Sequence, residues 1–508
     1  MAYAPKLLTL AADQPRLSRF ICFVLGALTT LSFAPFGLSL LPVLTMVPLL
    51  YVCMTVSPRD AGWHAFWFGF GLFLSGTYWI YISVVVFGQA PAWVALLLML
   101  GLTLIMSFWL FLAGWLIARL TQGEPLQLIA VAPAAWVLVE WLRGWVATGF
   151  PWLAYGYAQV DSAFGGYAPL FGVYGASFAV VMTAAALLAA LMSRGMGRVR
   201  MVALAFIVLP WIGGGLLKFA EWTEADGEPL EVTILQAGVP QDQKWLPEVR
   251  QPTLDFYRDQ TRIARDSRIV VWPEVAIPSL TSYEEAFIAQ LDSDARENGQ
   301  TILFGILEDE EYRGERYIYN SVIALDGYRR QVYRKRHLVP FGEYFPVPAK
   351  VREWMRMMNL PHSDLTPGDD VQVLITTQNG VQLSVAVCYE DAYAAEQRYA
   401  LPAAGMLINV SNDAWFGDSI AAHQHLQIAR MRSLEFGRPT VRSTNTGISA
   451  FINHRGVIVR QGPQHEETTM TAVVQPRTGS TLFTANGNLP IVGLCLVLLG
   501  LFWMRTRT

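Results

Sequence analysis

Residues 381–390, VQLSVAVCYE, decide how the second half of this chain folds. The run 381–387 is apolar and rich in valine, which is typical of a strand buried on both faces of a sheet. Cys388 and Glu390 follow where that strand would end. The pattern therefore places one thiol beside a carboxylate at the end of a strand.

Two upstream stretches have the same form. Residues 271–274 (VWPE) end on the carboxylate of Glu274, and residues 333–338 (YRKRHL) carry the ammonium of Lys335. A free thiol near neutral pH is only a few per cent thiolate, so a cysteine nucleophile needs a base or a nearby cation. Each residue alone is a weak signal, but the ordered set predicts a thiol nucleophile, Cys388, with Glu274 as base and Lys335 as cation.

Composition separates this chain from most soluble proteins. Hydrophobic residues make up 53% and charged residues only 15%, and the mean hydropathy is +0.34, so much of the surface must face lipid. The formal net charge is −3 and the pI is near 6.2, with no Lys/Arg-rich tract. These values exclude a nucleic-acid-binding function.

The four cysteines fall into two classes. Cys22, Cys53 and Cys495 lie in apolar runs, where cysteine behaves as a small hydrophobe, whereas Cys388 lies among ionisable neighbours and predicts a free, functional thiol. His423 and His425 suggest metal ligands, but no third ligand follows at a suitable spacing. The sequence therefore predicts neither a disulfide framework nor a metal, and no cofactor is expected.

Eight stretches are apolar enough to cross a bilayer, which takes about 20 residues in a helix. The first is followed at once by Pro35-Phe36-Gly37 and a second apolar stretch, so it is expected to remain as an anchor rather than be cleaved as a signal peptide. The predicted spans are 19–34, 38–56, 63–87, 91–119, 126–145, 168–192, 201–220 and 488–504.

Basic residues mark every second boundary of these spans, whereas loops 34–39, 88–92 and 147–169 contain none. Short cytoplasmic loops carry an excess of Lys and Arg, so both termini are predicted to be cytoplasmic and the region from about 225 to 480 to lie outside the cytoplasmic membrane. The marking residues are Lys6, Arg16, Arg19, Arg59, Arg119, Arg194, Arg198, Arg200, Arg505 and Arg507.

Three domains follow: a membrane domain over 1–222 with about seven spans, an α/β domain over 228–475, and a C-terminal span within 484–508. In the middle region, short β-type runs alternate with helical patterns, which predicts an α/β domain whose core strands are covered on both faces. The strand-like runs are 231–239, 268–275, 300–308, 320–325, 381–390, 405–413, 439–452 and 456–461. The helix-like runs are 246–266, 284–298, 391–401 and 420–437.

Residues 341–361 (FGEYFPVPAKVREWMRMMNLP) combine Trp and Met with Lys and Arg between prolines. Two interpretations stay open: a helix packed on the domain, or an amphipathic arm that reaches the headgroup region. Within the membrane domain, Glu140 and Arg143 are three residues apart and could pair on one helix face, either as a structural ion pair or as a headgroup contact.

The outer domain resembles the nitrilase superfamily, whose Glu-Lys-Cys triad is set on an α-β-β-α sandwich. The whole chain resembles the apolipoprotein N-acyltransferase family, the integral membrane branch of that superfamily. The stretches that carry the resemblance are 140–144 (EWLRG), 149–152 (GFPW), 236–245 (QAGVPQDQKW), 333–343 (YRKRHLVPFGE), 388–390 (CYE) and 411–418 (SNDAWFGD).

The resemblance implies a two-step acyl transfer, the last step of bacterial lipoprotein maturation. Cys388 would take an acyl group from a phospholipid such as phosphatidylethanolamine, with Glu274 as base and Lys335 stabilising the oxyanion. The α-amino group of a diacylglyceryl-cysteine at the N-terminus of an apolipoprotein would then attack the thioester. The location implied is the bacterial inner membrane, with the catalytic domain on the periplasmic side.

The resemblance also carries supporting site residues. Glu343 and Glu390 would orient Lys335 and the amine, Trp245 would position lipid or the arm, and Tyr389 is expected in the site. The arm and the loop 414–417, which contains Trp415, would keep water from the thioester. A monomer is expected, because spans around the domain would block the contacts by which soluble relatives assemble.

Other classes of function predict different behaviour. A membrane-tethered amidase or nitrilase with the same three residues would hydrolyse small, water-soluble substrates. A non-enzymatic membrane module would retain its function after Cys388→Ser. A permease is disfavoured, because the predicted spans hold few charges beyond Glu140 and Arg143.

Overall fold

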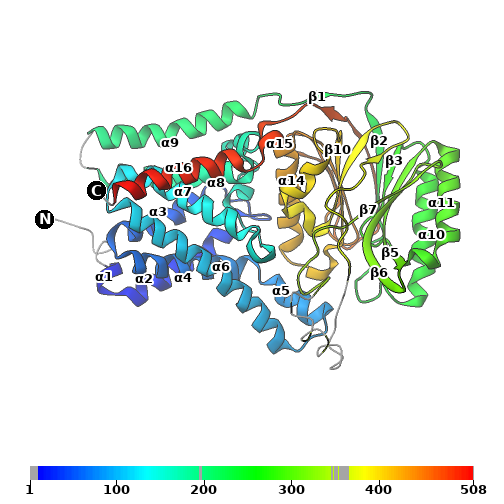
Figure 1. The fold of residues 1–508 in the computed structure, drawn as a ribbon, viewed down its shortest axis with the longest axis horizontal. Helices are drawn as coiled ribbons and strands as arrows, with labels where there is room; N and C mark the ends of the chain where they lie inside the picture. Colours follow the sequence, from blue (N-terminus) through cyan, green and yellow to red (C-terminus); the bar gives the residue numbers. More distant parts are fainter. Residues whose placement is uncertain are drawn as a thin grey trace. The chain divides into compact units, whose positions relative to one another are not determined.

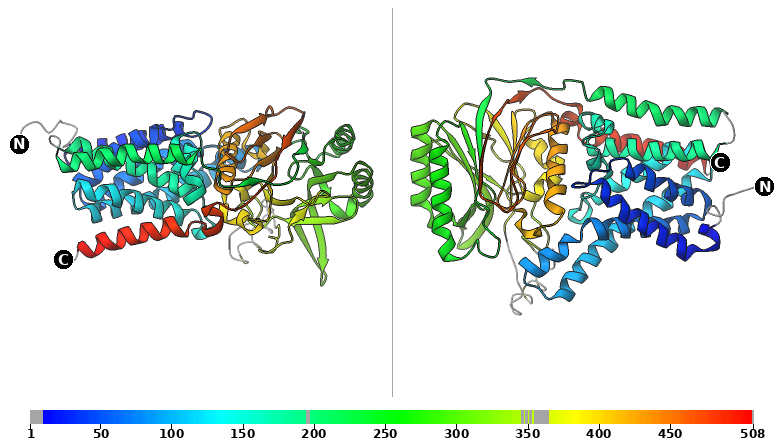
Figure 2. Two further views of the ribbon diagram at one scale, coloured as in Figure 1. Left: turned by 90° about the horizontal axis from the view of Figure 1, so that it is seen from above. Right: turned by 180° about the vertical axis from the view of Figure 1, so that it is seen from behind.

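The computed structural model describes residues 10–193, 197–344, 347, 350, 353 and 365–506. Contacts divide the chain into two compact units (Figures 1 and 2). Unit 1 holds Met1–Val85, Ala90–Ala220 and Ala485–Thr508, and unit 2 holds Val86–Gln89 and Glu221–Thr484. Most of the stretch 341–361, for which two interpretations were open, lies outside the described residues.

Unit 1 is built of helices, and Figure 1 shows its long helices side by side. Their sequences are almost continuously apolar, as expected for helices in lipid, where the helix satisfies every backbone polar group internally. The bounds are α1 Leu10–Asp13, α2 Pro15–Thr29, α3 Leu41–Thr55, α4 Pro58–Gly76, α5 Trp79–Ile82, α6 Ala92–Thr121, α7 Pro125–Arg143, α8 Ala168–Met192, α9 Arg198–Leu217 and α16 Leu489–Arg505.

Among the described residues, four helices are long and apolar enough to cross a membrane: α6, α7, α9 and the stretch Ala163–Met192 that contains α8. A fifth is counted if α4 and Trp79–Phe87, bent by 48° from each other, form one span. Helices α3 and α16 are shorter apolar helices of 15 and 17 residues. Unit 1 therefore has the composition of a membrane domain, and the number of eight spans stays a prediction.

Helices α2 and α4 approach each other through two glycines. A β-carbon on Gly26 would lie 1.8 Å from the carbonyl oxygen of Phe68, and one on Gly71 would lie 1.9 Å from that of Phe23. No side chain fits at either distance, so the absence of a β-carbon is what lets the two backbones touch. Small residues have this role in membrane helix pairs generally.

Glu140 and Arg143, near the end of α7, are both 1% exposed. Their hydrogen bonds go to other residues rather than to each other, and one of them comes from the indole N–H of Trp136, which donates to Glu140 at 3.0 Å on the same helix. Glu140 accepts from the backbone N–H of Tyr155 at 3.1 Å, while Arg143 donates to the carbonyls of Phe150 and Trp152 at 2.6 and 2.8 Å. The two side chains thus hold the segment 150–155 that follows the helix.

The described strands of unit 2 form two main sheets. The first has the order β14-β2-β3-β5-β6-β7 with β4 beside β5, and the second has the order β13-β12-β11-β10-β9-β8. The bounds are β2 Leu230–Gln236, β3 Ile269–Val271, β4 Ile277–Leu280, β5 Thr301–Tyr312, β6 Glu315–Leu325, β7 Arg330–Arg334, β8 Ile375–Thr376, β9 Gln382–Val387, β10 Met406–Ser411, β11 Thr440–Thr444, β12 Ala450–Ile452, β13 Ile458–Gln461 and β14 Thr468–Val474. A small pair joins β1 Glu224–Ala225 to β15 Arg477–Thr478.

The two sheets face each other across one apolar core and carry helices on their outer sides (Figure 1). Val232 and Val271 of the first sheet and Val385 and Ile408 of the second share that core. Outside the first sheet lie α10 Pro247–Ile263 and α11 Glu285–Asn298, and outside the second lies α14 Ala421–Phe436. The predicted α-β-β-α arrangement is confirmed, and it explains why 381–387 is apolar on both faces.

One predicted helix is not continuous. Residues 391–401 form three short helical pieces instead of one helix: the 3-10 helix η8 Cys388–Ala392, the α-helix α13 Ala394–Gln397 and the 3-10 helix η9 Arg398–Ala400. Glu390 explains the first turn, because its carboxylate accepts the N–H of Val387 at 2.7 Å and closes the chain tightly after β9.

Candidate active site

Glu274, Lys335 and Cys388 each follow the end of a strand: β3, β7 and β9 respectively. All three are buried, with exposures of 6%, 1% and 9%. The turn that carries Glu274 lies directly on Gly305, where a β-carbon would be 2.4 Å from the N of Val275 and 2.7 Å from the Cα of Glu274. Glycine is therefore required there for the turn to reach its position.

Lys335 is the centre of a cluster of charges. Its Nζ lies 2.9 Å from Glu343 Oε1 and 3.6 Å from Glu274 Oε1. Asn320 of β6 joins the two carboxylates, since its Nδ2 donates to Glu274 Oε1 at 2.7 Å and to Glu343 Oε1 at 3.0 Å. One ammonium and one amide thus fix both carboxylates relative to each other.

The electrostatics of Lys335 and Cys388 follow from burial and from these neighbours. Burial works to lower the pKa of Lys335, but Glu343 and Glu274 outweigh it and raise that pKa above its usual value, so the side chain is an ammonium. Burial raises the pKa of the Cys388 thiol, Glu274 raises it further, and Lys335 opposes both. The resting state therefore pairs a neutral thiol with a permanent cation, and the thiol must lose its proton as it attacks.

Cys388 stands in an unusual backbone conformation. Its φ is +52°, in the left-handed region that glycine favours. A non-glycine residue held there costs about 1–3 kcal/mol and persists only where the surrounding structure fixes it. This conformation lets the chain turn sharply between β9 and η8, and such a strained turn is typical of a nucleophile at the end of a strand.

Glu390, 0% exposed, holds the two strand ends together. Its Oε1 accepts from the N–H of Arg336 at 2.7 Å and of His337 at 3.2 Å, and its Oε2 accepts from the N–H of Val387 at 2.7 Å. The hydroxyl of Tyr333 donates to both oxygens at 3.0 Å. Glu343 contacts Lys335 as predicted for an orienting residue, whereas Glu390 acts through the backbone on either side of Lys335 and Cys388.

Replacing Glu390 with glutamine is expected to lower activity about 10- to 100-fold, the range seen when a group that orients a functional residue is lost. The amide would present a donor to N–H groups that need an acceptor, and a buried unsatisfied donor costs about 1–3 kcal/mol. The measurements are kcat and the thermal unfolding midpoint. Glu285→Gln, at a side chain that is 60% exposed, is the matched control. Full activity of Glu390→Gln would contradict the proposed role.

The other predicted site residues lie further from the charges. Trp245 is 52% exposed and Trp415 is 41% exposed, so each offers an aromatic surface outside the buried cluster. Tyr389, half-buried, accepts a hydrogen bond from the Tyr393 hydroxyl at 3.0 Å. The side chain of the preceding residue, Lys244, is buried instead, and its ammonium donates to the backbone carbonyl of Glu274 at 3.2 Å.

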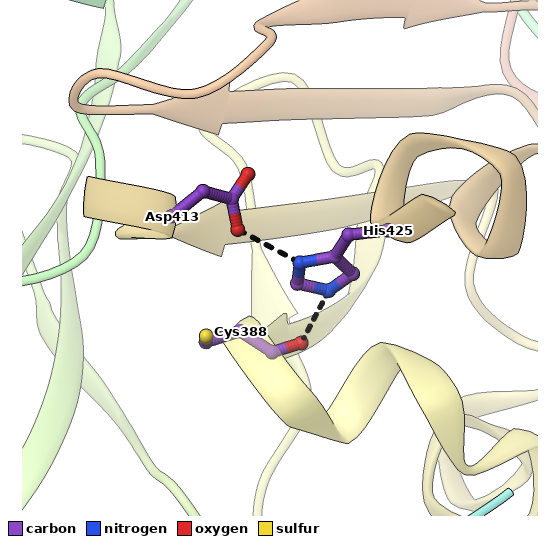
Figure 3. A group of neighbouring side chains, drawn as sticks. All are labelled: Cys388, Asp413 and His425. Atoms are coloured by element: carbon purple, nitrogen blue, oxygen red, sulfur yellow. Dashed lines mark hydrogen bonds and ion pairs between the residues drawn. The ribbon is translucent and has the colours of Figure 1, made fainter. Parts of the chain in front are cut away.

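Figure 3 shows a second buried group beside the thiol: Cys388, Asp413 and His425. Their possible ligand atoms lie within 4.8 Å of one another, as in a metal site. The Asp413 oxygens, however, already accept from Ser411 and His425 on Oδ1 and from Arg442 on Oδ2. A guanidinium bound to the carboxylate competes with a metal ion, so the donor set fits a hydrogen-bond network better than metal coordination.

Sequence patterns missed Asn320, Lys244, Asp413 and Arg442 as neighbours of the site. All four are polar and at most 4% exposed. A buried polar residue must find a partner, but the sequence does not show that these residues are buried. The signal available was the polar interruption of apolar strands, as at Asn320 before 321–325 and Arg442 within β11.

Comparisons with known proteins find one matching family for each of the two units. The model of the apolipoprotein N-acyltransferase N-terminal domain matches residues 25–186, and that of carbon-nitrogen hydrolase matches residues 232–482. The apolipoprotein N-acyltransferase of Methylococcus capsulatus is 39% identical over 484 residues, 95% of each chain. That of Photobacterium profundum is 37% identical over 92% of this chain and 90% of its own.

A structural likeness is to a mutant of the Nesterenkonia AN1 amidase, at 15% identity and a TM-score of 0.38, covering 49% of this chain and 93% of the other. The matched families and the two units define the class: a membrane-bound enzyme with a carbon-nitrogen hydrolase domain. The sequence relationship is more specific than that class. The chain belongs to the apolipoprotein N-acyltransferase family.

Proposed function

We propose that this protein transfers an acyl group from a phospholipid, phosphatidylethanolamine in the first place, to the N-terminal diacylglyceryl-cysteine of apolipoproteins. The family relationship over 95% of the chain supports the reaction. The observation that carries the mechanism is the buried Lys335 ammonium, which lies between Glu274 and Glu343 and opposes the rise that burial and Glu274 cause in the pKa of the Cys388 thiol.

In the first half-reaction, Glu274 takes the proton from the Cys388 thiol as the sulfur attacks the sn-1 ester carbonyl. Negative charge develops on the carbonyl oxygen, and the Lys335 ammonium stabilises it in a site from which water is largely excluded. The C–O bond then breaks, and the lysophospholipid oxygen takes the proton from Glu274. Cys388 is left as an acyl-thioester.

In the second half-reaction, the acceptor's neutral α-amino group attacks the thioester carbonyl. Glu274 takes a proton from that nitrogen while Lys335 again stabilises the oxyanion. The C–S bond breaks, the amide forms, and the Cys388 sulfur recovers the proton. A thioester is well suited to this step, because it reacts readily with amines. Water is the competing nucleophile and must be kept away from it.

The supporting residues receive roles consistent with their positions. Glu343 holds the Lys335 ammonium, and Glu390 holds the chain around it. The exposed aromatic faces of Trp245 and Trp415 suit contact with acyl chains or with the acceptor lipid. Tyr389 follows the nucleophile directly and would contact the bound substrate.

In the proposed membrane arrangement, residues 1–222 and 484–508 supply eight spans and residues 228–475 form the catalytic domain. That domain lies on the periplasmic side of a bacterial inner membrane, with both termini cytoplasmic, and the protein works as a monomer. The distribution of Lys and Arg supports this orientation. Both substrates reach such a site from the outer leaflet.

The test is a reconstituted assay. The purified full-length protein is incubated in vesicles with phosphatidylethanolamine and a diacylglyceryl-cysteinyl lipopeptide, and products are identified by mass spectrometry. The expected products are an N-acylated lipopeptide and one lysophospholipid per turnover. An N-acetylated lipopeptide, which has no free amine, is the control and should give no product. Hydrolysis of small amides with no acyl transfer would instead favour the amidase.

A further inference from the structure

The carbonyl group of Cys388 has a partner that the proposed chemistry does not use. His425 of α14 is 1% exposed, and its Nε2 lies 3.1 Å from the Cys388 carbonyl oxygen. In Figure 3 the carbonyl of Cys388 points toward the ring and its sulfur points away. The imidazole therefore contacts the backbone of the nucleophile rather than its reacting atom.

The other ring nitrogen is also engaged. His425 Nδ1 lies 2.8 Å from Asp413 Oδ1, and Asp413 Oδ2 accepts from Arg442 at 2.8 Å. Burial works to raise the pKa of Asp413, but Arg442 and His425 hold it well below its usual range, so Asp413 is a carboxylate. A carboxylate and a carbonyl can only accept hydrogen bonds. Both bonds to His425 therefore form together only when the ring carries two protons.

We propose that His425, held as an imidazolium by Asp413, is a positioning residue that fixes the carbonyl of Cys388 and thereby aims its sulfur. The left-handed backbone at Cys388, φ +52°, is the reason such a holder is needed. With the carbonyl released, the turn can relax toward an ordinary conformation, and the sulfur moves away from Glu274 and Lys335, the two groups that act on its charge. This inference rests on the proposed role of Cys388 as nucleophile.

Ser411 completes the network from the other direction. Its hydroxyl donates to Asp413 Oδ1 at 3.0 Å, and its side chain also acts on the Cys388 thiol, whose pKa it lowers against the larger effect of burial. The thiol and the carbonyl of one residue are thus tied, through Ser411 and His425, to the same carboxylate. Asp413 is itself fixed by the buried guanidinium of Arg442, 0% exposed.

Two variants of one residue separate positioning from simple structural support. In His425→Gln the amide nitrogen occupies the place of Nε2 and can still donate to the Cys388 carbonyl, but the bond to Asp413 is lost. In His425→Asn the amide nitrogen occupies the place of Nδ1, so the bond to Asp413 is kept and the one to Cys388 is lost. The matched control is His423→Gln, two residues away on α14.

The readout is the rate of Cys388 alkylation by iodoacetamide together with the single-turnover rate of acyl-enzyme formation, both in the full-length protein. His425→Gln is expected to stay within 10-fold of wild type and His425→Asn to fall about 10- to 100-fold, the usual cost of losing an orienting contact. KM for the phospholipid should not change. The opposite order, equal losses or no loss in either variant would overturn the proposal.

A second measurement needs no variant at position 425. In the wild-type protein labelled with 15N-histidine, one imidazole is expected to show both nitrogens protonated and hydrogen-bonded, because both face acceptors, and neutral rings throughout would overturn the proposal. The alkylation assay also separates this inference from the proposed function, because iodoacetamide is not a substrate analogue. If wild type forms no acyl-enzyme, the function fails; if it does and the two variants match wild type, only the inference fails.

Discussion

Replacing Cys388 with alanine is expected to abolish the acyl-enzyme completely. Incubated with phosphatidylethanolamine and no acceptor, the wild-type protein should gain the mass of one fatty acyl group, and hydroxylamine should remove it. Cys388→Ala should gain nothing, because the thioester needs the sulfur. Overall activity should fall to background, a loss of about 10⁶-fold, as for removal of a covalent nucleophile in other acyl-transfer enzymes.

The position of the other cysteines makes this experiment specific. Cys22, Cys53 and Cys495 are all buried in the helical unit at 2% exposure or less. Cys53→Ala is therefore the matched control and should acquire the adduct as wild type does. An adduct of equal size on Cys388→Ala would place the acyl group elsewhere and refute the nucleophile. No adduct on any protein, with lipid shown to bind, would remove the two-step mechanism.

Local sequence pattern predicted the fold of unit 2 where strands are buried on both faces. Runs such as 381–387 and 405–411 are mostly apolar and almost wholly buried, because helices cover one side and the opposite sheet covers the other. Strand β14 was not predicted. Its burial alternates weakly, and it is held by pairing with β2, more than 230 residues earlier, which no local window reveals.

The sequence identified some residues of the candidate site and not others. Glu274, Lys335 and Cys388 each close a strand-like run, which marked them as candidates. Their strands are not neighbours, because β5 and β6 separate β3 from β7 and β9 belongs to the other sheet, so the sequence pattern alone did not show that they meet. His425 was considered only as a metal ligand, and ligands were sought at regular spacing along the chain. The structure brings its partners from 12 and 37 residues away, because α14 packs on the turn after β9.

The role of Lys335 is the second prediction with a large expected effect. Lys335→Met should lower kcat by at least 10²- to 10³-fold, the usual cost of losing one oxyanion donor. The loss should exceed that range, because Glu274 and Glu343 would then face each other with no cation between them. One of the two carboxylates would take up a proton. If Glu274 is that residue, the base disappears together with the oxyanion donor.

The double variant Lys335→Met/Glu343→Gln separates these two contributions. Removing Glu343's charge relieves the repulsion on Glu274 and so restores the base, but it cannot restore the ammonium. Single-turnover acylation by the double variant should therefore recover part of the loss and remain at least about 10²-fold below wild type. Recovery to near the wild-type rate would mean that Lys335 serves only to keep Glu274 ionised. In that case the oxyanion would need another donor, and Lys244, buried with its Nζ 3.2 Å from the carbonyl of Glu274, would be the next cation to test.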